Sequence, residues 1–109
     1  MAATYNITIN QNADFIRSFQ VKENNVVLDI TNFTFEGRIK ESFHTPGHTS
    51  FTTSIVDAAT GTFQVALTDV QTAAMIGGTS VYDLIMTTAA GVKTRILSGN
   101  AFVIQGVTP

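Results

Sequence analysis

The chain has 109 residues, no cysteine and a formal net charge of −2, which excludes a disulfide framework, a thiolate metal site and a cysteine nucleophile. Charged residues make up only 13% of the sequence, about half the usual share of roughly 25%. The six Lys and Arg residues are spread along the chain, so we expect no nucleic-acid partner. No apolar stretch approaches the roughly 18 residues of a membrane span, so we expect no membrane partner. A surface this poor in charge favours burial of part of it in an assembly.

The N-terminal half predicts four strands. Alternating apolar residues indicate a first strand over residues 5–9 and a second over residues 13–22. Arg17 falls on the apolar face of the second strand, which indicates an edge or a bend. A short third strand is predicted over residues 26–30. The clearest alternation, over residues 33–40, predicts a strand with one buried and one solvated face.

A loop is predicted over residues 42–49, centred on the turn dipeptide Pro46-Gly47. Two further strands then follow, beginning at Phe51 and Phe63. Residues 68–76 form the only helical window, which spans one to two turns and therefore connects strands instead of forming a layer. Thr68 and Gln71 have the spacing of a capping box. Three apolar residues of this window share a predicted face: Val70, Ala73 and Ala74.

The last segment, residues 79–108, predicts a β-hairpin around an Ala-Ala-Gly turn. Ser98-Gly99 interrupts its second strand and predicts a bulge. Asp83 and Arg95 lie on opposite strands and predict a cross-strand ion pair. Altogether, about seven or eight strands with regular turn signals indicate an all-β sandwich or barrel with one short connecting helix. We expect residues 1–109 to form a single domain.

The candidate metal ligands are His44 and His48, which are the only two histidines and flank Pro46. Two imidazoles at this spacing could share a metal ion, with Glu41 as the nearest carboxylate, but a site needs at least one more ligand. Pro46 excludes the helical arrangement of a H-E-x-x-H motif. The pattern favours a polar loop tip with two exposed histidines, so we expect no metal.

No constellation of residues indicates catalysis. The sequence has no G-x-S-x-G motif for a nucleophile elbow. Most of the Asp residues fall at turns and caps, where local hydrogen bonding explains them. Gly77-Gly78 precedes a strand instead of a helix, which argues against a phosphate-binding loop. We therefore expect a protein that is not an enzyme and needs no cofactor.

Four segments in order carry a resemblance to a known class of proteins: YNITINQNADF, LDITNFTFEGRIKES, GTFQVALTDVQTAAM and YDLIMTTAAGVKTRILSGNAFV. They resemble small virion proteins of tailed bacteriophages, and in particular the immunoglobulin-like N-terminal domains of upper baseplate and receptor-binding-protein-shoulder proteins. The resemblance covers nearly the whole chain and brings no catalytic residues. It implies an immunoglobulin-like antiparallel β-sandwich that joins other virion proteins in a symmetric assembly.

The resemblance implies a structural role in the tail, the baseplate or the fibre-attachment region of a virion made in the host bacterial cytoplasm. No receptor-binding head follows the sandwich in this sequence, so an adaptor role is expected over direct receptor binding. A capsid decoration protein and a carbohydrate-binding attachment module are the alternatives. An exposed strand edge or terminus could add to a neighbour's sheet, and the candidate contact residues are Tyr5, Ile7, Gly106 and Val107.

Overall fold

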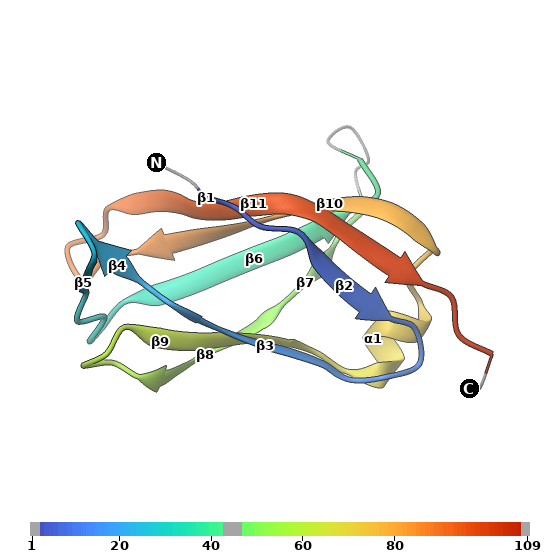
Figure 1. Cartoon of the computed structure of the whole chain (residues 1–109), viewed down its shortest axis with the longest axis horizontal. Helices are drawn as coiled ribbons and strands as arrows, with labels where there is room; N and C mark the ends of the chain where they lie inside the picture. Colours follow the sequence, from blue (N-terminus) through green and yellow to red (C-terminus); the bar gives the residue numbers. More distant parts are fainter. Residues whose placement is uncertain (1–2, 43–46, 108–109) are drawn as a thin grey trace.

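The computed structural model describes residues 3–42 and 47–107, which form eleven strands and one short helix. Six strands build the larger sheet. They are β1 (Ala3–Thr4), β2 (Ile7–Asn10), β11 (Lys93–Ile104), β10 (Gly78–Thr87), β6 (Thr34–Lys40) and β7 (Thr49–Ser50). β1 and β2 both pair with β11, and β10, β6 and β7 follow in that order. Three strands build the second sheet: β3 (Phe15–Gln20), β9 (Thr62–Leu67) and β8 (Thr52–Asp57). Figure 1 shows the two sheets as the layers of a sandwich.

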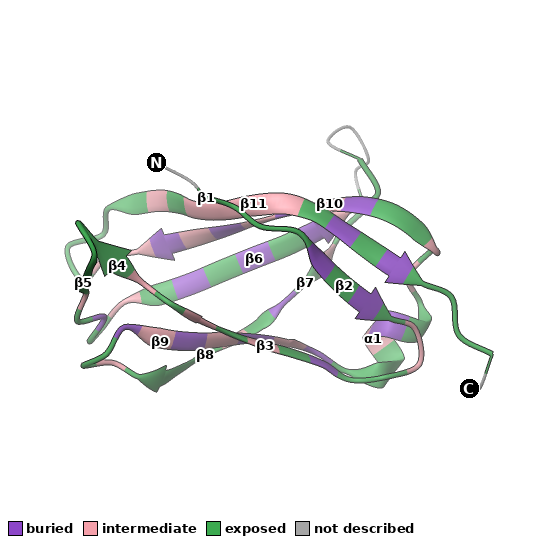
Figure 2. Ribbon diagram, in the orientation of Figure 1, coloured by how far each residue is buried: buried purple, intermediate pink, exposed green. Residues whose placement is uncertain are grey.

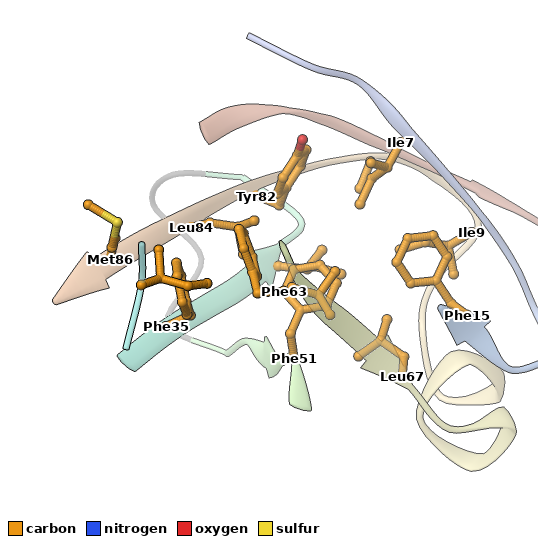
Figure 3. Packing of buried hydrophobic residues seen from close by; sticks show 14 residues of the cluster. Ile7, Ile9, Phe15, Phe35, Phe51, Phe63, Leu67, Tyr82, Leu84 and Met86 are labelled. Atoms are coloured by element: carbon orange, nitrogen blue, oxygen red, sulfur yellow. The ribbon is translucent and has the colours of Figure 1, made fainter. Parts of the chain in front are cut away.

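The core lies between the two sheets, because each central strand alternates buried and exposed residues (Figure 2). Phe35 of β6 and Phe63 of β9 stack across the core with ring centroids 4.0 Å apart. Leu84 of β10 is fully buried and belongs to the same cluster (Figure 3). The all-β sandwich with one short helix is therefore confirmed, and so is the half-buried strand predicted over residues 33–40.

The third predicted strand is largely wrong. Of residues 26–30 only β5 (Val26–Val27) is a strand, and it pairs with β4 (Lys22–Glu23) in a small separate hairpin. The carboxylate of Asp29 accepts hydrogen bonds from the backbone N–H and the hydroxyl of Thr31, at 2.9 and 2.5 Å. These two bonds lower the pKa of Asp29. They fold the backbone into a turn that ends the extended segment.

The helix α1 (Asp69–Ala73) begins where the sequence predicts. Thr68 accepts from the backbone N–H of Gln71, whose side chain accepts from the backbone N–H of Thr68, so the predicted capping box is confirmed. The face that Val70, Ala73 and Ala74 share points to solvent. Val70 is 74% exposed, and the buried residue is Thr72, whose hydroxyl donates to the backbone carbonyl of Ala13 at 2.9 Å. A hydrogen bond across to another segment thus turns the apolar side of the helix outward.

The predicted bulge lies in β11, but at a different residue. Leu84 pairs with Leu97 and Ile85 pairs with Arg95, so Ile96 is the extra residue. Ser98 and Gly99 continue the regular ladder with β10. The bulge position depends on strand register, which the Ser-Gly dipeptide does not encode.

Candidate interaction surface

Tyr5 joins the N-terminal strand to both sheets. Its backbone N–H donates to the carbonyl of Ser98 in β11 at 2.9 Å, and its own carbonyl accepts from the hydroxyl of Tyr82 in β10. Its ring packs edge-on against Phe19 of β3, with centroids 5.7 Å apart. Arg17, also in β3, donates to the Tyr5 hydroxyl at 2.9 Å. The side chain of Tyr5 therefore serves the fold, although 41% of the residue is exposed.

Gly99 explains why the N-terminal strand can lie so close to β11. A Cβ atom at position 99 would meet the Tyr5 carbonyl oxygen at 2.3 Å, well inside van der Waals contact. One residue further on, the backbone N–H of Asn100 donates to the side chain of Asn6 at 3.0 Å. The glycine that the sequence interpretation took for a bulge is thus a point of close backbone approach.

The other three candidate contact residues lie in different environments. Ile7 is 2% exposed and belongs to the core, so its side chain offers no contact surface. The backbone N–H of Gly106 donates to the side chain of Gln11 at 3.1 Å, which holds the tail against the start of the chain. Val107 is 98% exposed. Of these three, only the Val107 side chain is free to contact a partner, and its role stays a prediction.

A charged surface that the sequence did not predict lies on the outer side of the larger sheet. Residues at alternate positions of β6, β10 and β11 point away from the core there. We name this surface the basic face and define it by eight residues: Glu36, Arg38, Lys40, Val81, Asp83, Ile85, Lys93 and Arg95. A hollow of about 660 Å³ opens on it, lined by Arg38, Lys40, Asp83 and Arg95 among others. Periodicity predicted the solvated face of β6 alone, and only the strand order brings β6 beside β10 and β11.

Two ion pairs lie on the basic face. Arg95 Nε lies 3.2 Å from Asp83 Oδ2, which confirms the predicted cross-strand pair. Arg38 and Glu36, two residues apart on β6, are 3.0 Å apart. Lys40 and Lys93 form no ion pair within the described chain. The face therefore keeps two unpaired positive charges.

A second surface is the outer side of α1, which carries the predicted shared face of Val70, Ala73 and Ala74. We name it the α1 face and define it by Asp14, Asp69, Val70, Ala73 and Ala74, all exposed. The carboxylate of Asp14 accepts from the backbone N–H of Asp69 at 2.8 Å, so the two acids lie together. An apolar strip flanked by two carboxylates thus faces solvent at one end of the sandwich.

The histidine pair is described only in part, because His44 lies outside the described residues. His48 is exposed and lines a shallow pocket with Glu41 and Met75. Among the residues that the structure describes, no three His, Cys, Asp or Glu side chains gather closely enough to hold a metal ion. In that same part of the chain, no helix is long and apolar enough to cross a membrane.

Comparison with known proteins identifies a fold relative. The chain shares the fold of the N-terminal domain of phage TP901-1 ORF48. The two structures superpose with a TM-score of 0.62 and 10% sequence identity, over 90% of this chain and 83% of that chain. No protein-family model matches the sequence, and no curated protein matches it. Sequence identity this low establishes the shared fold alone.

Proposed function

We propose that this protein is a non-enzymatic structural component of a tailed-phage virion, and that it acts as an adaptor in the tail, baseplate or fibre-attachment region. The structural similarity to a phage protein domain over nearly the whole chain carries the proposal. The order of the four sequence segments that resemble phage baseplate domains supports it independently. Its partners are then other virion proteins, including further copies of itself.

The strand arrangement supports an immunoglobulin-like classification within this proposal. β3, β9 and β8 form one sheet, and β6, β10 and β11 form the centre of the other. This division matches the B-E-D and C-F-G sheets of immunoglobulin-like sandwiches. Here the N-terminal strand pairs in parallel with β11, the last strand, instead of joining the smaller sheet.

The surface composition agrees with an assembly role. Large apolar side chains are exposed on several elements, among them Ile16 on β3, Val56 on β8, Val70 on α1 and Ile104 on β11. The chain is also poor in charge, so few charges would have to be desolvated when neighbouring subunits cover the surface. Both features suit a subunit that is largely enclosed by other proteins.

Purified virions test the proposal directly. We expect a labelled antibody against this protein to mark the tail or baseplate in negative-stain images. Quantitative mass spectrometry should give a copy number that is a small multiple of three or six. Hundreds of copies would instead indicate a capsid decoration protein. Absence of the protein from intact particles would refute a virion role.

A further inference from the structure

We propose that copies of this chain associate head to tail, with the α1 face of one copy packed on the basic face of the next. This contact would join neighbouring copies in the assembly proposed above. Only the location of the contact in a virion rests on the proposed function. The two surfaces themselves belong to the isolated chain, so the contact can be tested apart from any particle.

The charge distribution is strongly uneven. Four of the six basic residues of the chain lie on the basic face, and only two of the eight acidic residues accompany them there. The basic face thus carries a net charge of +2, although the whole chain carries −2. Lys40 and Lys93 supply the excess, since both arginines already have acidic partners.

The α1 face has the opposite charge and a matching apolar centre. Asp14 and Asp69 give it a charge of −2, and none of its five residues is basic. Val70 directly follows Asp69 and is 74% exposed. On the basic face, Val81 and Ile85 of β10 are half-buried between the rows of cations. Docking would bury these apolar side chains together, while carboxylates and ammonium groups face each other around them.

The way α1 packs on the sandwich explains why its apolar side faces solvent. Thr72 fills the inward position, and its hydroxyl donates to the carbonyls of Ala13 and Asp69, at 2.9 and 3.1 Å. A helix that packed only for its own fold would bury Val70 and expose the threonine. The inverted arrangement leaves a hydrophobic side chain available to a second copy.

The two surfaces adjoin only at their rims, where Lys40 and Ala74 line one shallow pocket. The α1 helix lies at one end of the sandwich, whereas the basic face covers the outer side of the larger sheet (Figure 1). A contact between two different surfaces is heterologous, so repeating it gives a ring if the rotation closes and a filament if it does not. Such a contact suits a repeated element of a symmetric assembly.

The test uses sedimentation velocity on the purified chain at about 20 mM and about 300 mM salt. We expect the wild type to associate with rising concentration at low salt and to dissociate at high salt. Lys93→Glu and Val70→Lys should each weaken association at least about tenfold. Lys22→Glu, on β4, and Val56→Lys, on β8, make matched changes outside both surfaces and should leave association unchanged. Thermal melting confirms that each variant folds.

Mixing the two impaired variants gives the sharpest outcome. Lys93→Glu keeps an intact α1 face, because Lys93 lines a hollow only with residues of β6, β10 and β11. Val70→Lys keeps an intact basic face, so an equimolar mixture should form a 1:1 dimer that grows no further. A wild type that stays monomeric at low salt would overturn the inference, as would a mixture that stays monomeric. Either result leaves the virion proposal standing, because that proposal depends on the presence of the protein in particles.

Discussion

The hydroxyl of Tyr82 donates a hydrogen bond to the backbone carbonyl of Tyr5, 77 residues earlier in the chain. Tyr82 lies in the centre of β10, and its ring is buried in the core. The bond therefore fixes the N-terminal strand at the place where it passes from β1 to β2. Several neighbouring contacts depend on that position.

Tyr82→Phe should test the value of this bond. The substitution keeps the ring and removes the donor, leaving the Tyr5 carbonyl with one partner fewer. We expect the free energy of unfolding to fall by about 1 kcal/mol, measured by urea denaturation. Hydrogen exchange should become faster at the amides of residues 5–10. An unchanged free energy of unfolding would show that water replaces the hydroxyl at no cost.

The same hydroxyl predicts a dependence on alkaline pH. Burial, followed by the nearby Tyr5, raises the pKa of Tyr82 from 10.0 to about 12. The folded state thus holds this proton more tightly than the unfolded state, so the stabilisation is complete below pH 10 and is lost as the pH rises towards 12. We expect the stability difference between wild type and Tyr82→Phe to shrink over this range. A difference that stays constant from pH 9 to 12 would contradict the assignment.

Gly99→Ala should displace the N-terminal strand. The new Cβ would lie 2.3 Å from the Tyr5 carbonyl oxygen, and backbone cannot yield as a flexible side chain does. We expect a loss of about 1–3 kcal/mol, seen as a lower melting temperature. Gly47→Ala is the control, because nothing lies within 4 Å of that position. Equal stability of the two variants would exclude the close approach at Gly99.

Thr72→Val should destabilise the attachment of α1. Valine matches the shape of threonine but leaves the Ala13 carbonyl without its donor in a buried site. We expect a loss of about 1–2 kcal/mol by chemical denaturation. Thr72→Ser restores the hydroxyl and should recover part of that loss. If serine behaved no better than valine, packing and not hydrogen bonding would hold the helix.

Asp83→Asn separates fold stability from association. The ion pair with Arg95 is partly exposed, so its removal should cost less than about 1 kcal/mol. Removal of the carboxylate would raise the net charge of the basic face by one. We therefore expect head-to-tail association to become stronger at low salt. Weaker association would show that Asp83 contributes to the contact itself.

Local patterns predicted the parts of the fold that local physics controls. Alternation identified β6, and the residues of the capping box identified the start of α1. The register of β11 was not predictable, because the bulge at Ile96 depends on its pairing with β10. The shared face of Val70, Ala73 and Ala74 was predicted, but its outward direction was not, because the acceptor at Ala13 lies 59 residues from Thr72.

The interaction surfaces required the three-dimensional arrangement. The cations of the basic face come from two strands that are more than 50 residues apart in sequence, and they become neighbours only through β10. Along the sequence these cations are spread apart, so their distribution did not predict a basic surface. Ile7 was a candidate contact residue because the N-terminal strand was expected to offer an exposed edge. The sequence does not show that this strand pairs with β11 and turns the Ile7 side chain into the core.

The pairing of β1 and β2 with β11 also has a consequence for how the protein folds. Residues 3–10 are synthesised well before their partners, residues 97–104. Until the last strand emerges, Ile7 and Ile9 have no sheet to join and remain exposed. The closing step of folding of this sandwich therefore waits until residues 97–104 have been made, and contacts between such distant segments form slowly. A nascent chain halted before residue 97 would present an unpaired, apolar N-terminal segment to chaperones.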